Sequence, residues 1–479
     1  MNSHSISRRD WLTTAAMSAA AAALPRNVFS ADKKPNVLFI PVDDLRPQLG
    51  CYGKTNIHSP NIDRLASEGV LFERTYCNVP VCGASRASLL TGVRPTRERF
   101  VGYNTRADED LPGALTLPQH FKNNGYHTVC NGKVFHHNND MLDSWSETPW
   151  RPESIENRNW RNYVTPENLK ISKETENGRG PAYENADVDD GAYFDGMMTE
   201  KTLNDMRRLA KGDKPFFIAS GFLKPHLPFN APKKYWDRYD RDAIDMADNS
   251  YRPLNAPDAA IHQFGELRSY YGIPEKGRLP DDLARTLVHG YYACVSYTDA
   301  LVGRLLNELD ALGVRDNTIV ILWGDHGWNL REHGLWCKHC NFHTSLHTPM
   351  LVSAPGFGGG VRTPALTEFV DIFPSLCDLS GLETPAHLHG KSFVPLMRQP
   401  GLPWKDAIYS RFFNGESVRT DRYLYTEWLK DGETYARMLY DHQTDPDENV
   451  NIAGRPENQA LVQQLSRRLD EGRKLAHQI

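Results

Sequence analysis

The sequence predicts an α/β fold in which helices flank a large, mostly parallel central sheet, followed by a small C-terminal α+β subdomain with an antiparallel sheet. Continuous apolar runs recur along residues 32–400, and helical patterns separate them. Strands that alternate with helices favour a parallel sheet covered on both faces. After Pro400 the pattern changes to closely spaced strands and one final helix, which predicts the second part, residues 401–479.

Four apolar runs are expected to form buried strands of the large sheet. Residue patterns at helix ends bound the segments between them. Ser59, Pro60 and Gly69 are typical of the cap, first turn and end of a helix, and Thr116, Pro118 and Gly125 repeat this pattern. An amphipathic helix is expected around residues 301–313. The four strand segments are residues 36–42, 126–133, 214–222 and 317–324.

Residues 137–193 differ in composition from the rest, being polar and poor in aliphatic residues. We interpret this stretch as a long surface excursion rather than a domain. Its aromatic residues could stack on sugar rings, but we favour the interpretation that they fix the loop to the core. These aromatic residues are Trp145, Trp150, Trp160 and Tyr163.

The C-terminal part is expected to contain two strands within residues 417–441, joined at Lys430-Asp431-Gly432, and a helix over residues 457–472. At the other end, residues 1–31 contain Arg8 and Arg9, an alanine-rich apolar run and small residues near position 31. This pattern is typical of a cleaved twin-arginine export signal. It predicts an exported, periplasmic or extracellular bacterial protein without stable membrane insertion, although a membrane-anchored N-terminal helix is the alternative.

The net charge of −5 over 479 residues argues against a broad basic surface for nucleic acid, but permits a local cationic pocket for a small anion. Eight cysteines are scattered without the density of a disulfide scaffold, so their pairing stays open. Hydrophobic residues make up 40% of the chain, as in an ordinary globular protein.

Charged residues gather where the predicted strands end. Asp43 and Asp44 follow the first strand, and Asp325 and His326 follow the last. In open α/β sheets, functional groups lie beyond the carboxyl ends of strands. Three carboxylates and an imidazole there suit a hard divalent cation, calcium or magnesium, better than a histidine-rich zinc site. Lys133, His136 and His226 follow two other predicted strands. Together with Arg86 they form a cationic and acid–base set that suits a tetrahedral anionic ester.

The stretch CGASRASLLTG, which begins at Cys82, resembles the type I sulfatase signature, C-x-[P/A]-x-R followed by T-G. Further blocks occur in the order typical of that family, among them VLFIPVDDLRP, GKVFHH, GFLKPHLPF and GDHGWNLREHGLWCK. The last three are most similar to the iduronate-2-sulfatase branch. The resemblance implies an alkaline-phosphatase-like fold and a sulfuric ester hydrolase whose Cys82 is oxidised to formylglycine by a maturation enzyme.

The resemblance also implies roles for individual residues. The metal ligands are expected to be Asp43, Asp44, Asp325, His326 and the modified Cys82. Arg86 is expected to steady the formylglycine hydroxyl, and Lys133 and Lys338 to hold sulfate oxygens. His136 would take a proton from the hydrated aldehyde during release of sulfate, and His226 would protonate the leaving sugar oxygen. Such fixed cations and proton donors stabilise charge that develops during the transfer.

The sequence departs from the commonest form of the signature at Ala84, where most members have proline. This leaves open which maturation enzyme, formylglycine-generating or sulfatase-maturating, accepts the chain. Without conversion, Cys82 would give a metal-binding but largely inactive protein, and a non-catalytic sulfoglycan-binding protein is therefore one alternative. A phosphodiesterase or phosphonate monoester hydrolase of the same superfamily is another.

The expected substrate is a sulfated saccharide, cleaved in an exo manner, with a 2-O-sulfated uronate as the leading candidate. Tyr103, Asn104 and Arg106 follow the signature helix and are candidates for the sugar subsite, as is Trp328 beside the Asp-His pair; packing roles are the alternative. The stretch CKHCNFHTSLH contains Cys337 and Cys340, which could instead form a small zinc site or a redox pair with nearby histidines.

Overall fold

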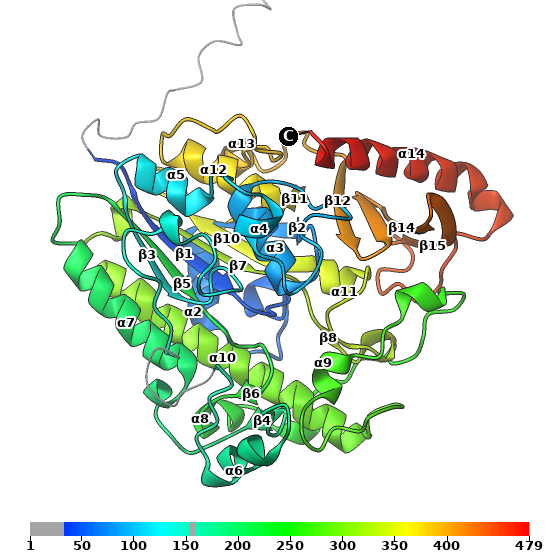
Figure 1. The fold of residues 1–479 in the computed structure, drawn as a ribbon, viewed down its shortest axis with the longest axis horizontal. Coiled ribbons are helices and arrows are strands. Elements are labelled where there is room, and N and C mark those ends of the chain that lie inside the picture. Colours follow the sequence, from blue (N-terminus) through cyan, green and yellow to red (C-terminus); the bar gives the residue numbers. More distant parts are fainter. Residues whose placement is uncertain (1–32, 153–159, 479) are drawn as a thin grey trace, which may run out of the picture. The chain divides into compact units, whose positions relative to one another are not determined.

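The large sheet is built on β1 (Asn36–Val42), whose apolar run is covered on both faces. The computed structural model describes residues 33–152 and 160–478. Seven strands lie in the order β11-β2-β10-β7-β1-β5-β3. β10 runs antiparallel to both of its neighbours, and the other neighbouring pairs are parallel. The predicted mostly parallel α/β sheet is therefore confirmed (Figure 1).

The other strands of this sheet are β2 (Val70–Tyr76), β3 (His127–Gly132), β5 (Phe216–Gly221), β7 (Thr318–Gly324), β10 (His347–Ser353) and β11 (Val361–Glu368). The longer helices of this part are α2 (Pro60–Glu68), α3 (Cys82–Thr91), α5 (Leu117–Asn123), α6 (Pro166–Glu174), α7 (Phe194–Leu209), α10 (Asp281–Ala311) and α12 (Ile372–Leu379). The short elements are α4 (Ala107–Asp110), β4 (Tyr183–Glu184), β6 (Phe229–Asn230), α8 (Lys233–Trp236), α9 (Gly265–Arg268), β8 (Asn329–Leu330), β9 (Trp336–Cys337), α11 (His343–Leu346) and α13 (Val394–Arg398).

Alternate side chains of β1 enter two separate hydrophobic cores, as the period of a strand requires. Leu38, Ile40 and Val42 pack with residues of α2, α7 and α10, whereas Val37 and Phe39 pack with residues of α3, α5 and α12. Both faces of the sheet are thus covered, which explains why the strand sequences lack polar alternation.

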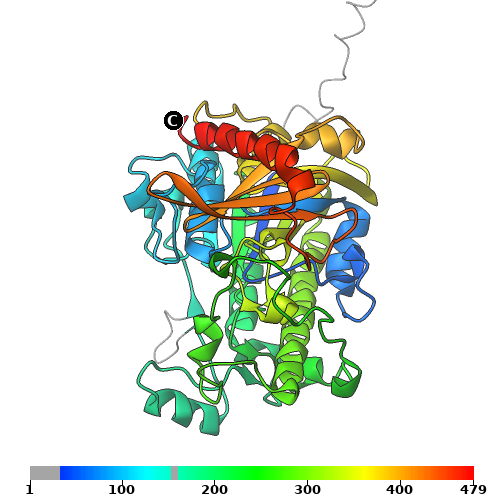
Figure 2. The same cartoon turned by 90° about the vertical axis from the view of Figure 1, so that its right-hand side faces the viewer.

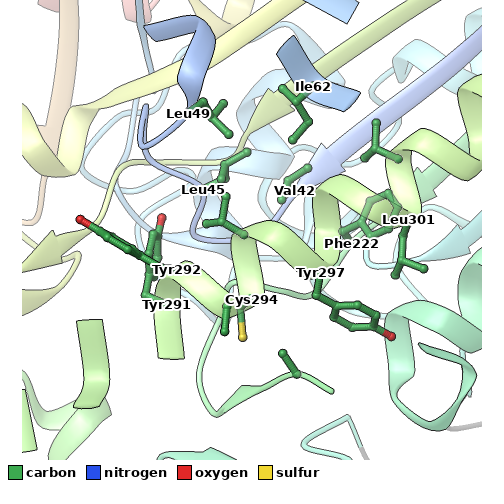
Figure 3. Packing of buried hydrophobic residues seen from close by; sticks show 14 of the residues in the cluster. Val42, Leu45, Leu49, Ile62, Phe222, Tyr291, Tyr292, Cys294, Tyr297 and Leu301 are labelled. Atoms are coloured by element: carbon green, nitrogen blue, oxygen red, sulfur yellow. The ribbon is translucent and has the colours of Figure 1, made fainter. Parts of the chain in front are cut away.

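The end of β1 rests on α10, a helix of 31 residues. Val42, Leu45 and Phe222 belong to the same hydrophobic core as Cys294 and Tyr297 of α10, and Figure 3 shows these residues around that helix. The sequence predicted only the C-terminal part of this helix, because the preceding stretch is buried on most sides and shows no clear apolar stripe. This packing holds the carboxyl end of β1 in a fixed place.

Two helix boundaries follow the predicted patterns with one difference. Thr116 accepts a hydrogen bond from the amide of Gln119 and caps α5. Ser59 precedes α2 but makes no capping bond; its hydroxyl accepts from the amide of Gly50 and donates to Asp63. The side chain of Ser59 therefore joins the helix to the preceding loop.

The C-terminal part contains a four-stranded antiparallel sheet, and the predicted second sheet is confirmed. The sequence predicted two strands within residues 417–441, but three fall there, because the turn at residues 421 and 422 is too short to be read as an interruption. Leu465 and Leu469 of the last helix pack on this sheet, and Figure 2 shows that helix along it. The elements are β12 (Ala407–Phe412), β13 (Gly415–Thr420), β14 (Tyr423–Lys430), β15 (Glu433–Asp441) and α14 (Gln459–Ala476).

The predicted export signal, residues 1–31, lies outside the described residues. From Pro35 onward the described residues form one compact unit. The predicted division after residue 400 falls between α13 and β12. The excursion over residues 137–193 contains α6 and β4, and Trp145 and Tyr163 are buried there. Within the described residues, no helix is both long and apolar enough to span a membrane.

Candidate active site

Two neighbouring parallel strands deliver four of the predicted metal ligands to one place. β1 ends just before Asp43 and Asp44, and β7 ends just before Asp325 and His326. The amide of Asp325 donates to the carbonyl of Val42 at 3.1 Å, and the amide of Asp44 donates to Oδ1 of Asp325 at 3.0 Å. All four side chains are fully buried. The two pairs of side chains lie close together because β1 and β7 are neighbouring strands of the sheet, although the pairs are far apart in the chain.

Cys82 is the first residue of α3 and points at this cluster. Its Sγ lies 3.3 Å from Nε2 of His326, whose Nδ1 bonds the carbonyl of Gly327 at 2.9 Å. The helix approaches closely at Gly83, because a Cβ there would lie 2.3 Å from the carbonyl oxygen of Tyr103. A side chain at position 83 would therefore prevent this position of Cys82, and glycine is required there.

Arg86 lies one helical turn after Cys82 and is fully buried between two of the carboxylates. Its Nε donates to Asp325 at 2.9 Å and its Nη2 to Asp43 at 3.2 Å. The Nη1 atom donates to the carbonyl of Val134 at 3.0 Å. The five donors of guanidinium suit this crowded position, where each carboxylate oxygen needs a partner.

The side chains fit a hard divalent cation. One ligand atom each from Asp43, Cys82, Asp325 and His326 lie within 4.8 Å of one another, and Asp44, Cys82 and His226 form a second such group. Three buried carboxylates supply the oxygen donors that calcium and magnesium prefer. Burial, reinforced by Asp43 against the opposing charge of Lys338, raises the pKa of Asp44 well above its usual value. A cation among these carboxylates would stabilise the ionised form of Asp44.

Two lysines lie next to these carboxylates. Lys133 follows β3 and pairs with Asp43, and Nζ of Lys338 lies 3.0 Å from Oδ1 of Asp44. Burial opposes their charge, but the carboxylates raise the pKa of both lysines, so both stay cationic. The position of Lys133 depends on Gly221, where a Cβ would lie 2.1 Å from the carbonyl oxygen of Lys133.

Two histidines complete the predicted set. Nδ1 of His226 bonds the carbonyl of Leu227 at 2.5 Å, so Nε2 is the nitrogen available to the cavity. His136 is half-buried, and burial, together with Lys133, lowers its pKa to about 2. Its Nδ1 has no hydrogen-bond partner within the described part of the chain. His136 is therefore neutral at pH 7.

These groups surround a cavity of about 640 Å³, large enough for a monosaccharide sulfate. The lining combines cationic side chains with the aromatic rings of Tyr103, Trp160 and Phe194. It consists of Val81, Cys82, Tyr103, Lys133, His136, His137, Asn138, Arg151, Trp160, Arg179, Phe194, Leu223, His226, Glu266, Lys338 and His339.

Sequence reasoning missed Glu266, which lies between two of the predicted catalytic groups. Its Oε1 is 3.0 Å from Nε2 of His226 and 3.0 Å from Nζ of Lys338. Glu266 belongs to the four-residue helix α9 within a long irregular segment, and no strand end or motif marks it. Arg151 and Arg179 were missed for the same reason. His339 follows Lys338 in the stretch CKHCNFHTSLH, but it was considered there only as a neighbour of the possible zinc or redox site.

The candidate sugar-binding residues separate into two groups. Tyr103 lines the cavity and is 62% exposed, and Trp160 of the excursion also lines it, 5.4 Å from the ring of His226. Arg106 is not part of the lining; it pairs with Asp108 and Glu109. The other two predicted residues, Asn104 and Trp328, are not in the lining either, and Trp328 is buried against the ammonium of Lys338.

The alternative site at Cys337 and Cys340 does not assemble among the described residues. The eight cysteines are unpaired, and neither Cys337 nor Cys340 belongs to a described group with the spacing of metal ligands. Sγ of Cys340 instead lies 3.0 Å from Oγ of Ser345. Lys338, between the two cysteines, reaches Asp44, which agrees with the place that the sulfatase resemblance assigns to it.

An unmodified Cys82 would be a poor nucleophile in these surroundings. Burial, reinforced by Asp43, raises the pKa of its thiol to about 12 when no cation is present. The thiolate is the reactive form of cysteine, and little of it exists at neutral pH with such a pKa. The position thus suits a precursor of another group better than a thiol nucleophile.

The fold and the cavity define a hydrolase of anionic esters with a buried metal-type cluster at the carboxyl ends of its strands. Residues 35–382 match the sulfatase family, and residues 331–475 match the C-terminal region described as that of N-sulphoglucosamine sulphohydrolase. The chain belongs to the sulfatase family, and is a sulfuric ester hydrolase.

Individual relatives agree with this assignment. Iduronate 2-sulfatase of Mus musculus is 31% identical over 529 residues, covering 91% of this chain and 94% of its own. A structure described as a complex with its substrate D-glucosamine-2-N,6-O-disulfate has a TM-score of 0.73 at 22% identity, covering 93% of this chain and 98% of the other. The phosphonate monoester hydrolase of Agrobacterium radiobacter has a TM-score of 0.75 at 23% identity, covering 92% and 96%. At these identities the two structures show a shared fold.

Proposed function

We propose that this chain hydrolyses a sulfate ester of a sulfated saccharide in an exo manner, with a 2-O-sulfated uronate or a related sugar as substrate and Cys82 as the precursor of formylglycine. The observation that carries the proposal is the convergence of Cys82, Asp43, Asp325 and His326 at one end of a cavity whose wall also presents two lysines. The 31% identity to an iduronate 2-sulfatase supports the uronate.

A divalent cation, calcium or else magnesium, would be held by Asp43, Asp44, Asp325, His326 and the modified side chain at position 82. When present, the cation supplies fixed positive charge beside the sulfate, and formylglycine supplies an oxygen nucleophile with a built-in route of release. Arg86 compensates the negative charge of the buried carboxylates of Asp43 and Asp325. It keeps Asp43 and Asp325 oriented toward the position of the cation.

Lys133 and Lys338 bind the sulfate oxygens in this proposal. Lys133 is held by Asp43, and Lys338 by Asp44 and Glu266, so that neither ammonium needs to reorganise as charge grows on the ester. Both lysines line the cavity together with Cys82. They can therefore contact two different non-bridging oxygens of one sulfate.

His226 and His136 divide the proton transfers between them. His226 acts as the acid in its imidazolium form, because Nδ1 uses its own proton to bond the carbonyl of Leu227. Burial lowers the pKa of His226, whereas Glu266, 3.0 Å from Nε2, favours the imidazolium. The Nε2 proton is donated to the departing sugar oxygen, which is a poor leaving group without protonation. Neutral His136 lies on the same cavity wall as Cys82 and accepts the proton that must leave the side chain at position 82 during release of sulfate. Positioned groups of this kind contribute about 10² to 10⁴ in rate.

The proposal includes export of the folded chain through the signal at residues 1–31 and conversion of Cys82 by a maturation enzyme that accepts Ala84. Mass spectrometry of the peptide that contains Cys82 tests conversion directly. Replacing the thiol side chain by an aldehyde lowers the peptide mass by about 18 Da. A peptide with an intact thiol in active preparations would exclude the aldehyde.

The function is tested by a desulfation screen on defined sulfated mono- and disaccharides, with the Cys82→Ala variant as control. We expect release of sulfate from a uronate or hexose sulfate by the wild type only. Aryl sulfate and aryl phosphate diester are assayed side by side, because the phosphonate monoester hydrolase fold is similar. Faster cleavage of the diester would favour that alternative, and binding of sulfated glycans without turnover would favour a non-catalytic role.

A further inference from the structure

The loop between β5 and β6 holds His226 through buried contacts that the proposed mechanism does not use. Asp195, the second residue of α7, is fully buried and accepts hydrogen bonds from the amides of Leu223 at 2.8 Å and Lys224 at 2.7 Å. Charge-assisted bonds of this kind are stronger than those between neutral groups. The carboxylate therefore fixes the start of the loop two residues before His226.

Lys224 holds the same loop from the inside. Its ammonium donates to the carbonyl of His226 at 2.8 Å and to the carbonyl of Pro228 at 2.6 Å. The backbone of Lys224 is itself anchored, because its carbonyl accepts from the hydroxyl of Thr298 on α10 at 3.1 Å. One side chain thus spans the turn and bonds the backbone on both sides of Leu227.

The ammonium of Lys224 is unusual in its surroundings. The side chain is 2% exposed, and no carboxylate oxygen of the described residues lies within ion-pair distance of its Nζ. Burial lowers its pKa. A buried charge satisfied only by carbonyl oxygens costs stability compared with an apolar side chain of similar volume. This cost in stability is explained if the ammonium of Lys224 is needed to hold His226 in its position.

We propose that Lys224 is a positioning residue, supported by Asp195, which sets the direction of the His226 imidazole through the backbone carbonyl of His226. With Nδ1 held by Leu227, the fixed backbone leaves Nε2 of His226 directed to the cavity, 3.0 Å from Glu266. The inference rests on the proposed function, in which His226 protonates the leaving oxygen. Lys224 itself is not part of the cavity lining.

The test compares two substrates that differ in their need for an acid. A sulfated monosaccharide has a poor leaving group that must be protonated, whereas 4-nitrophenyl sulfate has a good one that leaves without help. For Lys224→Met, which keeps the volume and removes the donors, we expect kcat on the sugar sulfate to fall by about 10-fold or more. On the aryl sulfate we expect kcat to stay within about threefold of the wild type.

A double-substitution cycle separates positioning from general loss of structure. His226→Ala should reduce sugar desulfation by about 100-fold, and adding Lys224→Met to it should cause little further loss, because both changes remove the same function. Lys233→Met, the same exchange at a half-exposed lysine of α8 paired with Asp237, is the matched control and should leave both activities unchanged. Equal losses on the two substrates, or losses that multiply in the double variant, would overturn the proposal.

A structural readout keeps the inference testable without activity. In a crystal structure of Lys224→Met, we expect the His226 ring to turn so that Nε2 loses its 3.0 Å contact with Glu266; an unchanged ring would contradict the proposal. If Lys224→Met does not fold, Asp195→Asn gives the same comparison from the other side of the loop. A wild type inactive on both sulfates would refute the proposed function, whereas equal losses in His226→Ala would refute only the role of His226.

Discussion

Nζ of Lys338 lies 3.0 Å from Oδ1 of Asp44, although 294 residues separate the two in the chain. Asp44 follows the first strand of the sheet, and Lys338 lies beyond the antiparallel pair β8 and β9. The pair joins a predicted metal ligand to a predicted sulfate-binding group, so that the charges of the two subsites depend on each other. Changes at either residue should therefore affect both metal and sulfate binding.

Removal of the cation should destabilise the protein. After treatment with a chelator we expect a lower Tm, restored by calcium, because a ligand at 100 times its Kd stabilises the folded state by about 2.7 kcal/mol. Differential scanning calorimetry at several calcium concentrations measures the shift. Asp325→Asn should abolish the response, whereas Asp213→Asn, at an exposed position, should keep it. A calcium response that persists in Asp325→Asn would place the cation elsewhere.

Loss of Arg86 should be costly for folding as well as for activity. Arg86→Met leaves the buried carboxylates of Asp43 and Asp325 without their shared partner, and breaking such a buried pair costs about 3–5 kcal/mol. Urea denaturation without calcium measures the loss in free energy of unfolding. Added calcium should recover part of it, because the cation supplies the missing positive charge. Arg207→Met, which breaks an exposed pair with Glu308, should cause no measurable change.

Much of the fold could be predicted because the apolar runs at β1, β3, β5 and β7 and the capping residues of α5 are local signals. The positions of Asp43 and Asp325 follow from one rule, since the carboxyl ends of parallel strands meet at one edge of the sheet. The roles of Lys338 and His226 came instead from resemblance, because each lies in an irregular segment that periodicity does not describe.

The walls of the cavity could not be predicted in the same way. Glu266 and Arg179 lie in segments without regular pattern, and their positions depend on how long loops pack over the sheet. Arg106 shows the opposite error: its place just after the signature helix suggested a sugar subsite, yet Asp108 and Glu109 hold its side chain outside the cavity lining. Closeness in sequence to a nucleophile does not determine which way a side chain points.

If the substrate is a uronate sulfate, we expect Arg179 rather than Arg106 to bind its carboxylate, because Arg179 lines the cavity and Arg106 does not. Arg179 lines the cavity with its guanidinium 5.2 Å from the centre of the Tyr270 ring. For Arg179→Met we expect KM for a uronate sulfate to rise by about 10-fold, as for loss of one charge-assisted contact. KM for a neutral aryl sulfate should not change. Arg106→Ala, the matched control, should affect the two substrates equally; a selective loss there would restore Arg106 to the subsite.

The buried carboxylate of Glu368 should make stability depend on pH far from the active site. Glu368 pairs with Arg94, and its Oε1 lies 2.8 Å from Nζ of Lys405. Burial opposes ionisation, but the two cations hold the pKa of Glu368 well below its usual range. In the unfolded chain the same carboxyl has a pKa of about 4.3. The unfolded state therefore binds more protons as the solution is acidified.

It follows that Glu368 contributes stability above about pH 4.3, and that this contribution is lost as the pH falls from there toward its folded pKa. Glu368→Gln should lower the free energy of unfolding at pH 7 by about 3–5 kcal/mol, because Arg94 and Lys405 lose a buried partner. Urea denaturation between pH 7 and pH 3 should show a smaller decrease for the variant than for the wild type, since the titrating group is gone. Glu433→Gln, at an exposed position on β15, should follow the wild-type curve. Parallel curves for Glu368→Gln and the wild type would show that Glu368 does not ionise differently in the folded protein.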